Sequence, residues 1–198
     1  YYEQSLAIQE ELGDTVGVGN SLIRIGSIHA GEVNIDKALD YYGRSLAIRE
    51  ELGDKRGMGE CIIGIGLVHY LKGDIDKALD CYGRSLVIDE ELGYKRGIEV
   101  CLHNIGLVHN LKGDYDKAEE YFEKSLSIQK EIIELDKGSS ILETTTYLYL
   151  AYKHLDKNYD IRKIHRLIEE VEEIEFKLYY PLYQLLDDTS YLETAYNQ

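Results

Sequence analysis

The residues best suited to chemistry in this sequence are its histidines, and three of them recur at a fixed interval. His29, His69 and His109 are forty residues apart. A metal site needs its ligands within about 2 Å of one shared ion. Residues that recur once every forty positions form a ladder and do not converge on a point. We therefore predict no metal site and interpret the three histidines as packed, amphipathic rings.

The three cysteines follow the same interval. Cys61 and Cys101 occupy one repeated position, and Cys81 stands where Tyr41 and Tyr121 stand in the neighbouring segments. Equivalent positions of stacked helices are roughly 10 Å apart, which is too far for a disulfide. We interpret the cysteines as small helix-packing residues in a reducing compartment, and we expect a cytoplasmic protein.

No catalytic pattern is present in the sequence. It contains no serine–histidine–acid set, no glycine-rich phosphate loop and no Cys-x-x-Cys. The repeated Gly-Asp pairs, such as Gly53-Asp54, are interpreted as helix punctuation. We predict that the chain is not an enzyme, with no catalytic residue and no cofactor.

Composition limits the class of partner. The chain has 198 residues with 22 lysines and arginines against 37 aspartates and glutamates, for a formal charge of −15. A field of that sign repels phosphate groups and anionic lipid heads, so we predict neither nucleic acid nor a membrane as partner. The sequence shows no long apolar run and no charged-then-apolar leader, so we expect neither a transmembrane helix nor a signal peptide.

The elements that position these residues follow from a repeat, which is clearest between Asp54 and Gly93. This stretch nearly matches itself when it is shifted forty residues in either direction. The positions in register include Ile25-Gly26, Ile65-Gly66 and Ile105-Gly106, and also Asp36-Lys37-Ala38, Asp76-Lys77-Ala78 and Asp116-Lys117-Ala118. A fixed period of this size predicts an architecture of stacked repeats. One unit cannot cover its own apolar face, so stability must come from stacking.

Each unit is predicted to consist of two helices, A and B. Helix A begins after the pairs Gly13-Asp14 and Gly53-Asp54, because glycine ends a helix and aspartate caps the next one; Tyr94 replaces the aspartate in the third unit. Helix A is expected to end at Lys72 and at Lys112 in the second and third units. The predicted caps of helix B are Asn34, Asp74 and Asp114.

Glycines inside the helices have two different interpretations. Gly66, together with Ala78 and Ser85, is expected to let neighbouring helices approach closely. Gly43 and Gly83 lie in the middle of helix B, where each costs about 1 kcal/mol relative to alanine. For these two we expect a close approach to something on the outer surface.

The spacing of small and large residues in the second unit resembles the tetratricopeptide repeat. The matching positions are Ile62, Ile65, Gly66, His69, Ala78, Tyr82 and Ser85. The first unit matches with Leu22, Ile25, Gly26, His29, Ala38, Tyr42 and Ser45, and the third with Leu102, Ile105, Gly106, His109, Ala118, Phe122 and Ser125. The resemblance implies an all-α, right-handed superhelical solenoid of antiparallel helix hairpins. The long period is similar to the subgroup found in kinesin light chains and Leu-Gly-Asn-repeat adaptors.

The period also predicts a division of the chain. The predicted segments are 1–13 (second helix of a truncated repeat), 14–53, 54–93 and 94–135 (three repeats), 136–176 (a degenerate fourth repeat) and 177–198 (capping helices). Helices are expected at 141–155 and 162–176 within the fourth repeat. Because the chain starts inside a helix B, we expect a fragment of a longer array. Its bare end would allow a homo-oligomer.

The functional surface is predicted on helix A. In the resembled family helix A forms the concave wall, and steps of three and four residues select its exposed face. The residues so selected are Asn20, Ile23, Arg56, Glu60, Ile63, Leu67, Tyr70, Arg96, Val100, His103, Leu107 and Asn110. Asn104 is added because it precedes the Ile-Gly pair at a position where the resembled subgroup often carries an asparagine that contacts the ligand. An alternative remains that Ile63 and Leu67 pack against neighbouring helices. Arg56 and Arg96 could pair with a carboxylate of the ligand, or instead form salt bridges to Glu60 or Glu99 within the chain.

Aliphatic residues between polar ends suit an extended or helical peptide laid along the array. We therefore predict a non-catalytic scaffold that binds a protein or peptide. Two alternatives remain. The first alternative to a binding scaffold is a structural solenoid that self-assembles, and the second is a regulatory sensor segment of a larger signalling protein.

Overall fold

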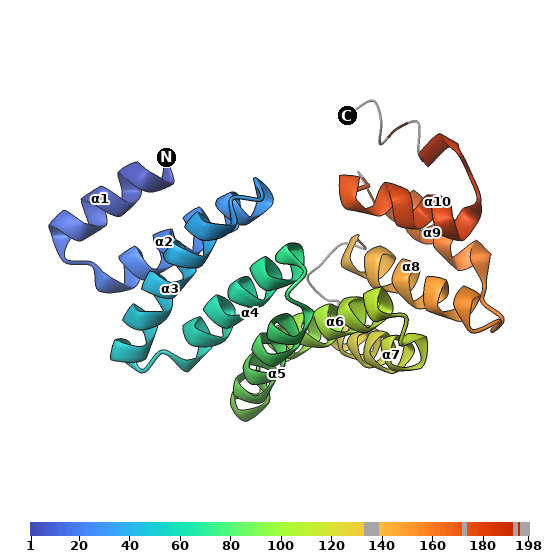
Figure 1. Cartoon of the computed structure of the whole chain (residues 1–198), viewed down its shortest axis with the longest axis horizontal. Coiled ribbons are helices and arrows are strands. Elements are labelled where there is room, and N and C mark those ends of the chain that lie inside the picture. The colour runs from blue at the N-terminus through green and yellow to red at the C-terminus, as the bar shows by residue number, and fades with distance from the viewer. Residues whose placement is uncertain (133–138, 172–173, 192–193, 195–198) are drawn as a thin grey trace. The chain divides into compact units, whose positions relative to one another are not determined.

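The computed structural model describes residues 1–132, 139–171, 174–191 and 194, and the regular elements among them are all helical. They are α1 (Tyr2–Leu12), α2 (Thr15–Gly31), α3 (Ile35–Leu52), α4 (Lys55–Lys72), α5 (Ile75–Leu92), α6 (Lys95–Lys112), α7 (Tyr115–Ile132), α8 (Ser139–His154), α9 (Ile161–Glu170), the short 3₁₀ helix η1 (Phe176–Leu178) and α10 (Tyr179–Leu186) (Figure 1). Consecutive helices pack as antiparallel hairpins, which confirms the predicted all-α fold. Helices α2, α4, α6 and α8 are the predicted A helices.

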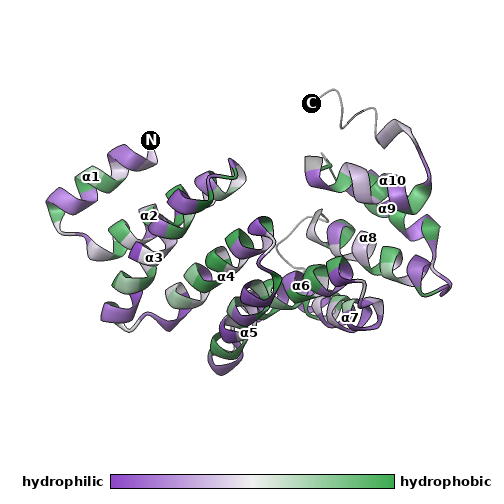
Figure 2. Ribbon diagram, viewed as in Figure 1, coloured by the Kyte–Doolittle hydropathy of each residue, from purple (hydrophilic) through white to green (hydrophobic). Residues whose placement is uncertain are grey.

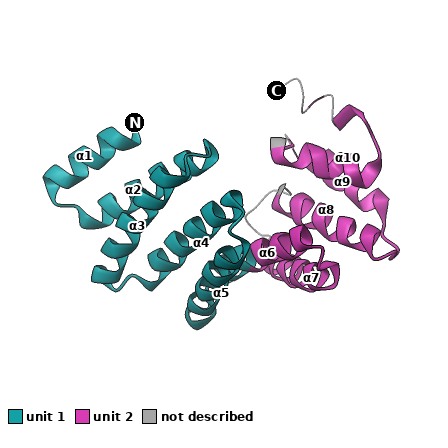
Figure 3. Cartoon of the chain, viewed as in Figure 1, with its two compact units in different colours: residues 1–101 teal, residues 102–198 magenta. Residues whose placement is uncertain are grey.

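The chain forms two compact units, residues 1–101 and 102–198 (Figure 3). The first contains α1 to α5 and the beginning of α6, and the second contains the rest of α6 and the helices that follow. Hydrophobic and hydrophilic residues are interspersed along the helices of both units (Figure 2). The two units are described separately below.

The predicted start and stop signals of helix A are confirmed in the first unit. Gly53 ends α3 in the left-handed region at φ 66°, and the Asp54 carboxylate then accepts a hydrogen bond from the Gly57 amide at 2.9 Å. Asp14 accepts the same bond from the Gly17 amide at 2.9 Å. The left-handed conformation explains why glycine stands at each of these turns.

The predicted N-cap residues of helix B are confirmed for Asn34 in α3 and Asp74 in α5, although their side chains do not form the capping hydrogen bonds. The Asp74 carboxylate instead lies 3.3 Å from His69 Nδ1. Asp114 pairs with His109 at the same distance, 3.3 Å. The repeated histidine thus competes with the helix end for the carboxylate.

Close packing inside the hairpins follows the small residues. A Cβ added at Gly66 would lie 2.7 Å from the Tyr82 ring. Ser45 bridges two A helices, because its hydroxyl donates to the Gly19 carbonyl at 2.9 Å and accepts from the Cys61 thiol at 3.3 Å. The repeated serine therefore binds the A helix of its own unit as well as that of the next.

Gly43 and Gly83 do not follow the expectation. A Cβ added at either glycine would meet no described atom within 4 Å. The predicted close approach is therefore absent within the described chain. Both glycines face open space on helix B.

The last helices depart from the predicted boundaries. Helix α8 begins at Ser139, and the predicted repeat boundary at 135–136 falls outside the described residues. The helix predicted at 162–176 is shorter than expected. Helix α9 ends at Glu170, and Val171 is extended, at φ −92° and ψ 141°. Five of the seven residues from 169 to 175 are glutamates, and this sequence disfavours a longer helix, because like charges repel one another and negative charge is unfavourable at a helix C-terminus.

The described part of the predicted capping segment 177–198 contains α10. Leu178, Leu182 and Leu185 are buried there in one core with Leu142 and Ile164. Across the described residues, none of the helices combines the length and apolar character that crossing a bilayer requires.

Candidate binding surface

The repeated histidines are packing residues. The His29 ring stacks on Tyr41 with 5.5 Å between ring centres, and His109 stacks on Tyr121 at 5.6 Å. Cys81 replaces the tyrosine beside His69, and a surface hollow of about 420 Å³ is lined there by both residues. Among the described residues no cluster of histidine, cysteine and acidic side chains is suited to a metal ion.

The cysteines are buried and carry free thiols. Burial raises the pKa of the Cys101 thiol to about 12, so it carries no thiolate at neutral pH. Burial also raises the pKa of Cys61 and of Cys81. Their interpretation as inert packing residues agrees with this environment.

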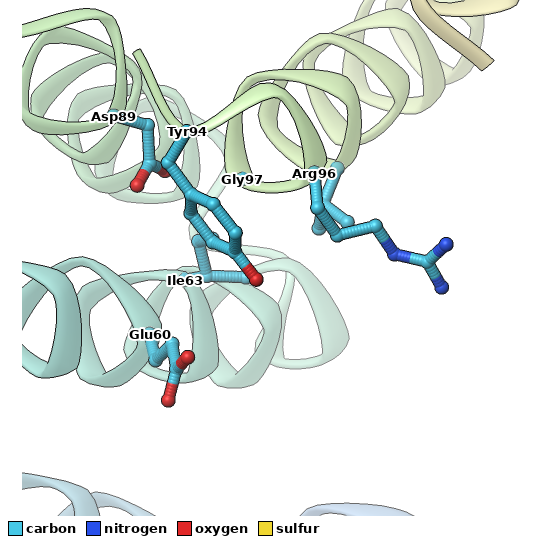
Figure 4. Close-up of a pocket in the computed structure, with 7 residues that line it drawn as sticks. Glu60, Ile63, Asp89, Tyr94, Arg96 and Gly97 are labelled. Carbon is cyan, nitrogen blue, oxygen red and sulfur yellow. The ribbon is translucent and has the colours of Figure 1, made fainter. Parts of the chain in front are cut away.

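Two neighbouring hollows lie on the A-helix face of the first unit. We call the first the α1–α4 hollow: it measures about 570 Å³ and is lined by Tyr2, Ser5, Gln9, Asn20, Ser21, Ile23, Arg24, Ser27 and Glu60. We call the second the α4–α6 pocket: it measures about 210 Å³ and is lined by Glu60, Ile63, Asp89, Tyr94, Arg96, Gly97 and Val100 (Figure 4). Glu60 lines both. The structure thus brings six predicted surface residues, Asn20, Ile23, Glu60, Ile63, Arg96 and Val100, to two adjoining concavities.

A buried carboxylate lies in the α4–α6 pocket. The Asp89 side chain comes from the last turns of α5 and is only 2% exposed. It accepts hydrogen bonds from the Ser85 hydroxyl at 3.3 Å and from the Cys101 thiol at 3.8 Å. Burial raises the pKa of the Asp89 carboxyl above its usual range, although those two hydrogen bonds act in the opposite direction.

The edge of the pocket carries charges of both signs. Arg56 lies 4.2 Å from the centre of the Tyr94 ring, donates to the Tyr94 hydroxyl at 3.0 Å and pairs with Glu60 at 3.5 Å. The Arg96 guanidinium points away from Asp89 and Glu60 (Figure 4). Arg56 therefore forms the salt bridge to Glu60 that the sequence indicates as an alternative to ligand binding.

The aliphatic residues of this face differ in exposure. Leu67 is 37% exposed, whereas Ile23 and Ile63 are half-buried. Ile23 packs on the core that contains Tyr42. Tyr70 is half-buried, and burial raises the pKa of its hydroxyl. Leu67 is thus the most exposed of the predicted aliphatic residues on this face.

In the second unit the predicted residues are engaged inside the chain. His103 Nδ1 lies 2.9 Å from the Thr144 hydroxyl, and His103 Nε2 lies 3.6 Å from Glu143. Leu107 packs on the core of that unit. Asn104 and Asn110 are half-buried, and Asn110 Oδ1 is buried with no hydrogen-bond partner among the described residues. The open part of the predicted surface is therefore in the first unit.

Helix α8 holds His103 in place through a charged cluster. Glu143 also pairs with Lys177 Nζ at 2.9 Å. Burial alone would raise the pKa of Glu143, but the hydrogen bond from His103 and the charges of His103 and Lys177 outweigh it and lower the pKa to about 2. This cluster is structural, since each of its charges has an internal partner.

The residue that sequence reasoning missed is Asp89. It belongs to a position near the end of each helix B that is polar in every unit, the others being Gln9, Arg49 and Gln129. Gln9 accepts from the Ser21 hydroxyl at 2.7 Å, and Gln129 donates to the Thr144 hydroxyl at 3.1 Å. A polar residue at this position in every unit, next to the apolar stripe of helix B, is the sequence signal that could have predicted a buried, hydrogen-bonded side chain here.

Comparison with known proteins matches part of the repeated region to a family. Residues 57–131 match the family described as Tetratricopeptide repeat. None of the curated proteins matches the sequence.

Solved structures share the fold. BtubC (BKLC) from P. vanneervenii is 19% identical with a TM-score of 0.67, over 85% of this chain and 68% of that one. The apo form of RapI is 17% identical with a TM-score of 0.75, over 99% of this chain and 56% of that one. A protein from Podosopora anserina described as a putative kinesin light chain with nearly identical TPR-like repeats is 15% identical with a TM-score of 0.57, over 85% of this chain and 81% of that one. At these identities the likeness shows the fold alone, and this chain spans little more than half of RapI.

Proposed function

We propose that this chain, whose residues 57–131 match the tetratricopeptide repeat family, is a scaffold that binds a polypeptide along the A helices of its first unit. Tetratricopeptide repeats generally mediate protein–protein interactions and are typically non-catalytic. The location of the binding surface and the extended form of the ligand are our inference.

One observation supports the location. The α1–α4 hollow and the α4–α6 pocket adjoin at Glu60, and α4 also exposes Leu67. Peptide recognition combines polar groups that hold a backbone with pockets that take selected side chains. Asn20 and Glu60 supply the polar groups, and the two hollows supply the pockets. A polypeptide of a few residues in extended form would reach both.

Selection of random peptides by phage display tests the proposal. We expect the chain to enrich a family of related peptides, and we expect Leu67→Asp to weaken their binding by at least about tenfold, because a charge replaces a central apolar contact. Val87→Asp is the matched control, because Val87 is an equally aliphatic residue, 55% exposed, on helix B. Equal affinity of wild type and both variants would refute the location, and failure to enrich any peptide family would refute the function.

A further inference from the structure

The α4–α6 pocket has a counterpart one repeat earlier, where the same positions are occupied differently. Forty residues separate Asp89 from Arg49, Tyr94 from Asp54, and Glu60 from Asn20. The comparison is internal to the first unit. We call the space between two consecutive A helices, beside the end of the helix B that joins them, a seam. The comparison shows which chemical group a seam of this kind accepts.

At the earlier seam, between α2 and α4, a guanidinium fills the space. Arg49 is only 4% exposed and donates hydrogen bonds to the Asp54 carboxylate and to Asn20 Oδ1. Its side chain runs against Gly57, where an added Cβ would lie 2.6 Å from Arg49 Cδ. A cation with two oxygen partners therefore closes this seam from inside.

At the later seam the charges are reversed. Asp89 replaces the arginine, and its shorter side chain leaves the pocket of about 210 Å³. Asp89 forms no ion pair among the described residues, since its hydrogen-bond donors, Ser85 and Cys101, are both neutral. Glu60 stands where the earlier seam has Asn20, so two carboxylates line a space that holds a cation one repeat before.

The neighbouring arginines leave the pocket open. Arg56 is 60% exposed and lies over the Tyr94 ring, where it also reaches Glu60. The Arg96 guanidinium points away from Asp89 in Figure 4. Ile63 and Val100 line the pocket as aliphatic walls.

We propose that the α4–α6 pocket takes an arginine side chain of the bound polypeptide, whose guanidinium pairs with Asp89 and Glu60. Its methylene stem would pack on Ile63 and Val100. A buried carboxylate without a cation is costly, and an incoming guanidinium offsets that cost through charge and paired hydrogen bonds. The planar fork of arginine suits two oxygen partners better than the point charge of lysine. This inference rests on the proposed function and specifies its ligand.

The test uses a capped amino acid, so it does not depend on an identified partner. The ¹⁵N-labelled chain is titrated with N-acetyl-arginine methylamide and, in parallel, with the neutral isostere N-acetyl-citrulline methylamide. We expect saturable shifts of the Gly97 and Val100 amides, with an affinity for the arginine probe at least about fivefold higher. The Gly57 amide is the internal control, because Arg49 already fills its seam.

Three variants complete the test. Asp89→Asn removes the buried carboxylate, and Glu60→Gln removes the exposed carboxylate that lines the pocket. We expect each variant to bind the arginine probe with an affinity at least about fivefold lower than wild type. Glu60 is exposed, so its variant remains informative even if the Asp89 variant fails to fold. Asp89→Arg is expected to fill the pocket with its own guanidinium, as Arg49 does, and to abolish the response.

The inference would be overturned by any of three results. Capped leucine or capped glutamate could shift the same amides as strongly as capped arginine, the citrulline probe could bind as well, or the response could persist unchanged in the variants. These results are distinguishable from failure of the proposed function. A chain that enriches peptides sensitive to Leu67→Asp but ignores capped arginine is a scaffold without an arginine pocket.

Discussion

Two glycines of one repeat illustrate how much a single residue depends on its surroundings. Gly66 faces the Tyr82 ring, whereas Gly83 faces open space. We expect Gly66→Ala to lower the free energy of unfolding by about 1–3 kcal/mol, because the ring must move. Gly83→Ala is expected to raise it by about 0.5–1 kcal/mol, since alanine is the better helix former. Urea unfolding measures both, and changes of the same sign would contradict this packing.

Asp89 is also a residue that the fold holds at a cost. An acid whose pKa is raised on folding binds more protons in the folded state, so stability falls as the pH rises from 3.8 through the folded pKa. Asp89→Asn removes that loss. We expect the variant to be at least as stable as wild type at pH 7 and its advantage to be smaller at pH 4. An asparagine variant that is destabilised more at pH 7 than at pH 4 would contradict the raised pKa.

At the scale of the element, the helices were largely predictable and the seams between them were not. The Gly53-Asp54 turn could be predicted because glycine and aspartate each act within one turn of the chain. Asp89 could not, because a 3.6-residue period identifies a face but does not show how long a side chain must be to fill the space between helices. Similarly, the period selected His103 for an open surface, but α8 covers it. Local signals set the elements, and side-chain volume sets the site.

The hairpin of α4 and α5 has a packing defect beside its repeated histidine. Tyr41 and Tyr121 stack on the repeated histidine, but Cys81 leaves a hollow beside His69. We expect Cys81→Tyr to restore the stack and to raise the free energy of unfolding by about 0.5–1.5 kcal/mol. Thermal unfolding compares it with Cys81→Ser, which leaves the hollow open. A tyrosine variant no more stable than the serine variant would show that the ring does not stack here.

At the scale of the whole molecule, the alternatives are peptide binding and self-assembly. Helix α1 exposes Ile8 and Leu12, with 57% and 76% of their surface open. If copies associate through these residues, the mass measured by light scattering will rise with concentration and Ile8→Glu will lower it. We expect peptide affinity to be unaffected by Ile8→Glu, because Ile8 lines neither the α1–α4 hollow nor the α4–α6 pocket. Loss of peptide binding together with loss of association would contradict that separation.

The central claim is that a polypeptide lies along the A helices of the first unit, and photocrosslinking tests it most directly. A selected peptide carrying benzophenone is crosslinked to the chain, and the attached positions are mapped by mass spectrometry. We predict crosslinks on α2 and α4, at or next to Ile23, Glu60 and Leu67. Crosslinks confined to α3 and α5, around Gly43, Gly83 and Val87, would contradict the claim.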